Sequence, residues 1–179
     1  MNELQQAYDR IMRPIEDCMI RSIWRIVRNA QDAEDAMQDS LLTVWKRWDR
    51  VRQHPNPEAL VLKICIDAAY DLTRRRVRDQ KGHELSCAAL ELADSSCSPS
   101  EDAVNTEQYA EIVAAIHRLS RQQAVATLMR IVQGQSYQHI AAALRCSEAT
   151  ARTHVARGRN RLQKSLSHLD PTNARGSSI

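Results

Sequence analysis

The sequence contains no Phe, and aromatic residues make up only 4% of its 179 residues. Gly (4) and Pro (5) are also scarce, while Ala, Leu, Arg and Gln recur. Sheets depend on aromatic and β-branched side chains, whereas this composition favours helices. At 43% hydrophobic and 26% charged, the chain can still bury a core. We expect an all-α fold of two small helical domains.

Several other features are missing. No run approaches the ~20 apolar residues that cross a bilayer, and residues 1–13 are polar and of mixed charge, so we expect a cytoplasmic protein without membrane insertion. The five cysteines form no CxxC pair, which argues against a disulfide framework or a zinc ribbon. No phosphate-binding glycine loop, nucleophile elbow or HExxH is present. An enzyme is therefore the least favoured class, and we expect no catalytic residue, metal or cofactor.

The net charge of +3 is unevenly distributed. Residues 60–81 carry six basic and three acidic side chains, and residues 118–166 carry nine basic side chains against the single acid Glu148. Between them, residues 82–117 contain seven acidic side chains and no Lys or Arg. Two basic segments flanking an acidic one are typical of modules that bind a polyanion, although solvated helix faces would give a similar pattern.

Helical periodicity covers residues 3–78, which we assign with residues 1–2 to a first domain. Pro14 suits the start of a second helix, and Asp32 can cap a third. The sequence His54-Pro55-Asn56-Pro57 ends that helix, and another follows over 58–78. The expected core stripe of the third helix is Met37, Leu41, Val44 and Trp48; that of the last is Leu60, Ile64, Ala68 and Leu72.

Residues 79–100 contain Gly82, Pro99 and a serine cluster, which predict a linker with a short helix at 85–93. A second domain over 101–166 begins with a helix to about Arg118. The residue pair Ser120 and Gln123 predicts a capping box for a helix to about Val132. Ser136 then caps a short helix to Leu144, a three-residue break follows, and a basic helix runs over 148–166. This arrangement predicts a helix-turn-helix, followed by a disordered tail at 167–179.

The basic helix has two faces. A rotation of 100° per residue places Ala151, Val155, Gly158, Leu162 and Leu166 toward the core. The opposite face carries Thr153, Ala156, Arg157, Asn160 and Lys164, flanked by Arg152, Arg159 and Arg161. The start of such a helix reads base edges in the major groove, so Arg152, Thr153, Ala156 and Arg157 are candidates for base contact. Arg159, Arg161 and Lys164 are candidates for phosphate contact.

These motifs resemble a known family. Residues 119–162, with Ser136-Tyr137-Gln138-His139-Ile140-Ala141 and Thr150-Ala151-Arg152-Thr153-His154-Val155-Ala156-Arg157-Gly158-Arg159, resemble region four of bacterial extracytoplasmic-function sigma factors. The stretch Asp32-Ala33-Glu34-Asp35-Ala36-Met37-Gln38-Asp39, with Leu42 and Trp45, resembles the polymerase-binding motif of region two. Asp71-Leu72-Thr73-Arg74 matches the DxxR step that ends region two. The resemblance covers residues 8–166 in the family's order.

The resemblance implies a sigma factor that binds core RNA polymerase and promoter DNA. Region two would bind the clamp helices of the largest subunit through Asp35, Gln38, Asp39 and Leu42, which lie away from the Met37 stripe. The second domain would contact the flap and read the minus-thirty-five element, with Thr150 added to the residues derived above. The minus-ten candidates are Lys63, Asp67, Asp71, Arg74, Arg75 and Arg76. An anti-sigma factor is a further expected partner.

The chain also departs from the family pattern. Leu60 and Asp67 stand where Trp and Asn are usual, and an aliphatic side chain or a carboxylate is a poor partner for an unpaired base or a phosphate. Arg145 replaces a Gly in the turn, at a position that often requires a positive φ. His139 and His154 replace Glu and Arg. We therefore expect an altered minus-ten preference or a need for a helper. A sigma-like or stand-alone helix-turn-helix regulator that cannot open promoters stays an alternative.

Overall fold

The computed structural model describes residues 3–84 and 99–169, and within these ranges all regular structure is helical. The all-α prediction is therefore confirmed. The short helix predicted over 85–93 and the tail from residue 170 onward lie outside the described residues.

The N-terminal helices surround one long central helix. They are α1 (Glu3–Ile11), the 3-10 turn η1 (Arg13–Ile15), α2 (Glu16–Val27), α3 (Ala30–Lys46), α4 (Trp48–Arg52) and α5 (Pro57–Glu84). Helix α5 packs against α2 and α3, and Val61, Cys65 and Ile66 within it are fully buried. Burial raises the pKa of the Cys65 thiol to about 12, so this cysteine is an unreactive core residue.

The junction between α2 and α3 is defined by two residues. Arg28 adopts a left-handed conformation (φ 57°) that ends α2, and Asn29 is the N-cap of α3, with its side chain accepting a hydrogen bond from the Asp32 backbone N–H at 2.8 Å. Asp32 was expected to be the cap. It lies instead in the first turn of α3, where its buried carboxylate accepts a hydrogen bond from the Asn29 amide at 2.7 Å.

Three other boundaries differ from the sequence prediction. Pro14 lies within η1, and α2 begins two residues later. Trp48 belongs to the separate helix α4 because the chain bends at Arg47. Helix α5 continues through Gly82 to Glu84 and so includes the start of the predicted linker. A single Gly lowers helix stability by only about 1 kcal/mol, which a 28-residue helix tolerates.

The C-terminal helices are α6 (Pro99–His117), α7 (Arg121–Ile131), α8 (Tyr137–Leu144) and α9 (Glu148–Ser165), followed by the 3-10 turn η2 (Ser167–Leu169). Ser120 occupies the N-cap position of α7, but its side chain makes no capping hydrogen bond, so the predicted capping box does not form. Gly134 has φ 67° and allows the turn between α7 and α8.

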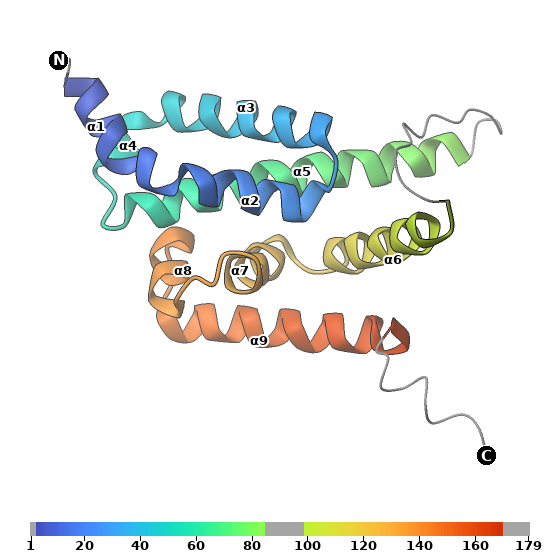
Figure 1. Ribbon diagram of the computed structural model, residues 1–179. Helices are drawn as coiled ribbons and strands as arrows, with labels where there is room; N and C mark the ends of the chain where they lie inside the picture. Colours follow the sequence, from blue (N-terminus) through green and yellow to red (C-terminus); the bar gives the residue numbers. More distant parts are fainter. Residues whose placement is uncertain (1–2, 85–98, 170–179) are drawn as a thin grey trace.

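The two sets of helices pack against each other. In Figure 1, α2, α3 and α5 form one layer, α7 and α8 lie against α5, and α9 lies on the far side. One cluster of buried apolar side chains runs through both sets. Across the junction, Tyr109 donates to the Ile26 carbonyl (2.5 Å) and Arg25 donates to the Val132 carbonyl (2.9 Å). These carbonyls lie at the ends of α2 and α7, where helices lack internal donors.

Candidate nucleic-acid interface

Helices α8 and α9 form the predicted helix-turn-helix. Ser136 and Ser147 are extended N-caps whose side chains accept hydrogen bonds from the backbone N–H groups of His139 and Thr150, each at 3.1 Å. Between the helices, Arg145 has φ 55°, the conformation expected for the Gly that it replaces. The Cys146 N–H then bonds the Ala141 carbonyl (3.0 Å), which closes α8 as a glycine-ended helix would.

The inner face of α9 is buried as expected. Ala151 and Val155 are almost fully enclosed, and Leu162 is half-buried. Gly158 lies so close to α7 that a Cβ there would be 2.1 Å from Thr127 Oγ1 and 3.3 Å from the Gln123 carbonyl. The missing side chain at residue 158 therefore determines how closely α9 packs against α7.

The outer face of α9 is exposed and basic. Its exposed residues include all the minus-thirty-five candidates: Thr150, Arg152, Thr153, Ala156, Arg157, Arg159, Arg161 and Lys164. Arg152 is held by the Glu148 carboxylate (2.6 Å), and its guanidinium lies over the Tyr137 ring, 4.6 Å from the centroid. Arg161 donates to the Gln123 side chain (3.1 Å). Arg157, Arg159 and Lys164 form no ion pair with another described residue, so their charges are available to a polyanion.

A second candidate surface lies on α3. Asp35, Gln38 and Asp39 are all exposed, and Leu42 beside them is 54% exposed. Gln38 donates to the Glu34 side chain at 3.3 Å. Neither Asp35 nor Asp39 is paired with a cation among residues 3–84 and 99–169. The predicted grouping of these four side chains on one exposed face is thus observed.

The minus-ten candidates on α5 differ in how accessible they are to DNA. Arg74 and Arg75 are exposed. Arg76 forms an ion pair with the buried carboxylate of Asp32 (2.5 Å). This ion pair joins α5 to α3, so the Arg76 charge is partly neutralised within the protein. Leu60 is only 7% exposed. In this arrangement Leu60 cannot stack on a base.

The remaining candidates on α5 form one cluster with Arg121 at the start of α7. Arg121 donates to both carboxylate oxygens of Asp71 (2.6 and 2.9 Å) and to Asp67 (3.1 Å), while Lys63 pairs with Asp67 from one turn away. The hydrogen bonds with Asp71 raise the pKa of Arg121 above its ordinary value. The sequence did not single out Arg121, because no periodic pattern links two helices 50 residues apart.

This cluster lies where the C-terminal helices pack against α5. A cleft of about 260 Å³ is lined on one side by Leu60, Lys63 and Asp67, and on the other by Arg121 and residues of α7 and α8. His54 and Gln133 also bridge the two sets of helices, through contacts of 3.2 Å to the Ala142 carbonyl and 3.0 Å to the Leu62 carbonyl. The C-terminal helices therefore cover the part of α5 assigned to minus-ten DNA.

Known family models match both the N-terminal and the C-terminal helices. The family model "Sigma-70 region 2" matches residues 17–79, and "Sigma-70, region 4" matches residues 109–162. The chain therefore belongs to the sigma-70 family of RNA polymerase sigma factors, in its extracytoplasmic-function type.

Curated relatives support this assignment. The chain is 30% identical over 177 residues to the probable RNA polymerase sigma factor RfaY of Xanthomonas campestris pv. campestris, covering 97% of this chain and 44% of that protein. It is 23% identical to the sigma factor SigX of Bacillus subtilis, covering 93% of this chain and 87% of SigX. The RNA polymerase sigma-E factor of Streptomyces avermitilis is 25% identical, with coverage of 91% and 87%.

A solved structure shares the fold. It is the sigma factor RpoE of Bartonella quintana in complex with the anti-sigma factor NepR, with a TM-score of 0.52 and 22% identity, and the match covers 93% of this chain and 98% of RpoE. Within the described residues, no helix has the length and apolar character needed to span a membrane. The same residues contain no group of three or more His, Cys, Asp or Glu side chains placed to hold a metal ion.

Proposed function

We propose that this chain binds core RNA polymerase through the exposed face of α3 and directs it to promoters that it reads with α9 and α5. The observation that carries the proposal is the presence of the polar α3 face and a basic helix-turn-helix in one chain. A repressor that only binds DNA would not need the polar α3 face. The residues involved are Asp35, Gln38, Asp39 and Leu42, and their partner is the clamp-helix coiled coil of the largest subunit.

The C-terminal helices, over about 101–166, form the module that reads the minus-thirty-five element and contacts the polymerase flap. Arg152 is the strongest candidate for base reading, because Glu148 and Tyr137 hold its guanidinium in one orientation at the start of α9. A fixed Arg fork fits the two acceptors on a guanine edge. Arg157 is the second Arg placed for base contact, and Arg159, Arg161 and Lys164 supply phosphate contacts further along the helix.

DNA binding by α9 is expected to depend steeply on salt. If the five Lys and Arg side chains on the outer face of α9 neutralise about five phosphates, DNA affinity should fall roughly 10²- to 10³-fold between ~50 and ~200 mM salt, because bound counterions are released. A fluorescence anisotropy titration with duplex DNA measures this slope. Lys164→Ala should reduce the slope of log affinity against log salt concentration by about one, the value for one phosphate contact, while Lys46→Ala on α3 should not change this slope. Binding that is equally strong at both salt concentrations would contradict docking of α9 in the groove.

The N-terminal helices, over residues 1–78 with α5 continuing to Glu84, form the module for minus-ten DNA. Because Arg121 and the C-terminal helices cover Lys63, Asp67 and Asp71, these residues reach DNA only after the two sets of helices separate. Polymerase binding supplies that separation when each module takes its own place on the enzyme. The free chain therefore binds promoter DNA mainly through α9.

Arg121→Ala is expected to weaken the packing of the C-terminal helices against α5. The variant leaves Asp67 and Asp71 without their cation from α7, so the two carboxylates repel each other at the junction. Small-angle X-ray scattering should show a radius of gyration larger by about 2 Å or more than the roughly 16 Å typical of a compact chain of this length. Arg118→Ala removes an exposed Arg that forms no described ion pair and serves as the control. Identical scattering from all three proteins would contradict a closure maintained by Arg121.

A second candidate function is a sigma-like regulator that binds polymerase without opening DNA. Leu60 and Asp67 favour it, since neither side chain suits an unpaired base. A permanganate footprint on a promoter with core polymerase distinguishes the two functions: reactive thymines near minus-ten show opening, and their absence despite polymerase binding shows the regulator. An Asp67→Asn variant no more active than the unmodified chain would show that Asp67 does not limit opening.

In this proposal the chain itself catalyses no reaction, because bond formation belongs to the polymerase. It acts in the cytoplasm, where the polymerase and the promoters are. Control by an anti-sigma factor is proposed by analogy with the RpoE–NepR complex.

A further inference from the structure

A cavity of about 250 Å³ lies where the N-terminal and C-terminal helices meet. Residues in and next to α2 and α5 form one side of it, and residues in and next to α6, α7 and α9 form the other. Helix α6 supplies a continuous wall, because Tyr109, Ile112, Val113, Ile116 and His117 recur at helical spacing. The cavity is therefore complete only while the two sets of helices are packed together.

The middle of the cavity is apolar. Most of its lining side chains are aliphatic, and two of them, Ile112 and Ile131, are 38% and 59% exposed. Leaving large aliphatic side chains in water costs free energy, which an apolar molecule bound against them would offset. The middle of the cavity therefore suits the hydrocarbon part of a ligand.

Two arginines lie at one end of the cavity. The Arg28 guanidinium lies over the Tyr109 ring, 5.8 Å from the centroid, and Arg25 donates to the Val132 carbonyl at 2.9 Å. Neither arginine forms an ion pair with another residue in the ranges 3–84 and 99–169. No Asp or Glu is among the described residues that line the cavity. This end is therefore positive and suits a carboxylate.

The other end carries buried polar atoms without a partner. Nδ1 and Nε2 of His117 are both buried, and neither has a hydrogen-bond partner in the part of the chain that the structure describes. The His117 ring packs instead on Tyr70, with centroids 4.7 Å apart. Burial, together with the nearby Arg74, lowers the pKa of His117, whereas Asp71 acts in the opposite direction. The ring is therefore neutral at neutral pH and presents one donor and one acceptor nitrogen.

A second unpartnered group lines the same cavity. The Thr127 hydroxyl belongs to a side chain that is almost fully buried, and it too lacks a hydrogen-bond partner among the described residues. Buried polar groups without partners are unfavourable. A ligand that brings a hydroxyl group to this end would therefore bind more tightly than one that ends in a methyl group.

The size of the cavity limits what it can hold. From Tyr109 to His117, α6 rises by about 12 Å. A cavity of ~150 Å³ holds benzene, so this one holds roughly ten non-hydrogen atoms. A helix of a partner protein is about 10–12 Å across and does not fit between the surrounding helices. The occupant is therefore a small molecule.

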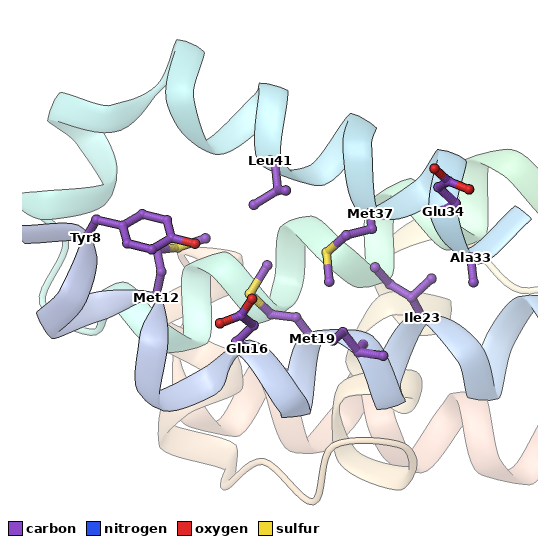
Figure 2. A pocket seen from close by; sticks show the side chains of 10 residues that line it. Tyr8, Met12, Glu16, Met19, Ile23, Ala33, Glu34, Met37 and Leu41 are labelled. Atoms are coloured by element: carbon purple, nitrogen blue, oxygen red, sulfur yellow. The ribbon is translucent and has the colours of Figure 1, made fainter. Parts of the chain in front are cut away.

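Another apolar hollow of the chain, between α1, α2 and α3, is a separate feature. In Figure 2, Met37 and Leu41 of α3 point toward α2. Glu34 on the rim of this groove accepts a hydrogen bond from Gln38 of the polymerase-binding face at 3.3 Å. The groove therefore belongs to the surface already assigned to polymerase, and it shares no lining residue with the cavity between the two sets of helices.

We propose that the cavity between the two sets of helices binds a small apolar carboxylic acid with a hydroxyl group at its far end. The carboxylate lies at Arg25 and Arg28, the hydrocarbon part lies along α6, and the hydroxyl group bonds His117. A straight-chain ω-hydroxy acid of about ten non-hydrogen atoms has this pattern of groups.

The ligand would also hold the two sets of helices together, because it contacts both of them. In this arrangement α7 and α8 cover the minus-ten candidates Lys63 and Asp67. The acid is therefore expected to oppose the separation that accompanies polymerase binding. This consequence, unlike the binding site itself, rests on the proposed function.

The first test compares four probes with the full chain. They are octanoate, 8-hydroxyoctanoate, and the corresponding amines octylammonium and 8-hydroxyoctylammonium, and an NMR titration of the isotope-labelled chain measures each affinity. Octanoate should bind about tenfold more tightly than octylammonium, and 8-hydroxyoctanoate about fivefold more tightly than octanoate. The proposal is overturned if octanoate does not bind or binds no better than octylammonium. It is also overturned if the hydroxyl group brings no gain.

Variants locate the site. Arg25→Gln with Arg28→Asn should weaken octanoate about tenfold, and Asn tolerates the left-handed backbone at residue 28. Arg10→Gln with Arg21→Gln makes the same charge change at two exposed arginines outside the cavity and should leave the affinity unchanged. Circular dichroism checks that each variant folds. Equal loss of octanoate binding in both double variants would overturn the assignment to this cavity.

A further variant tests the role of His117. His117→Phe keeps an aromatic ring against Tyr70 but removes both nitrogens. It should abolish the fivefold advantage of 8-hydroxyoctanoate over octanoate and leave octanoate binding nearly unchanged, which a merely structural role would not do. An advantage that persists in His117→Phe would show that the hydroxyl group does not bond this ring.

The regulatory consequence is tested separately. Saturating 8-hydroxyoctanoate should lower co-purification of the unmodified chain with core RNA polymerase at least about threefold, and it should have no effect on the Arg25→Gln, Arg28→Asn variant. Unchanged co-purification of the unmodified chain would overturn this consequence. A chain that binds 8-hydroxyoctanoate but never binds polymerase would contradict the sigma-factor proposal and leave the acid-binding site standing.

Discussion

Alanine at Asp35, Gln38 and Asp39 together is expected to lower co-purification with core RNA polymerase at least about tenfold. The three side chains lie on one exposed face of α3, beside the half-exposed Leu42. Tenfold corresponds to about 1.4 kcal/mol, which is modest for the loss of two charges and an amide from one contact surface. Because none of the three is buried, the variant should keep its fold.

The matched control for this variant replaces two acids and an amide elsewhere. Glu58, Gln122 and Glu107 are exposed on α5, α7 and α6, and their combined change to alanine alters charge and size in the same way. This control should bind polymerase like the unmodified chain. If both variants bind equally well, the α3 face is not the docking surface, and another surface of the N-terminal helices must replace it.

Gly158→Ala is expected to destabilise the C-terminal helices by about 1–3 kcal/mol. Alanine would ordinarily stabilise a helix by about 1 kcal/mol relative to glycine. Here its Cβ would overlap Thr127 Oγ1, whose side chain is almost fully buried and cannot move aside. The overlap forces α7 and α9 apart, at the cost typical of overpacking. Urea unfolding measures the loss, and DNA affinity should fall with it.

A double variant makes this prediction specific. Adding Thr127→Ala removes the oxygen nearest the new Cβ, so Gly158→Ala with Thr127→Ala should recover part of the stability lost by the single change. Asn160→Ala, on the exposed side of the same helix, should be neutral or slightly stabilising. A stabilised Gly158→Ala protein would show that α9 does not pack against α7 as described.

Local signals explain which parts of the fold the sequence predicts well. The cap Ser136, the positive φ at Arg145 and the two faces of α9 depend on neighbours within a few residues, and the structure confirms them. The bounds of α8 agree with the prediction for the same reason. The end of helix α5 was predicted six residues too early, because one Gly has a small effect inside a long helix.

Long-range contacts explain the rest. The ion pairs of Arg121 with Asp67 and Asp71, and of Arg76 with Asp32, join helices far apart in sequence, so no periodicity indicates them. Met37 and Leu41 follow the same stripe as Val44, and the pattern therefore predicted all three as core. Only the packing of α1 and α2 shows that the first two line an open groove. The exposure of Asp35 and Asp39, in contrast, followed directly from helical rotation.

The central claim is that this chain gives core RNA polymerase its promoter specificity. The most direct test adds the purified chain to core polymerase with a pool of genomic DNA fragments and maps the 5′ ends of the transcripts. The account predicts starts that appear only with the chain and that share two upstream sequence elements, near minus-ten and minus-thirty-five. Identical starts with and without the chain, although it binds both the polymerase and DNA, would contradict it.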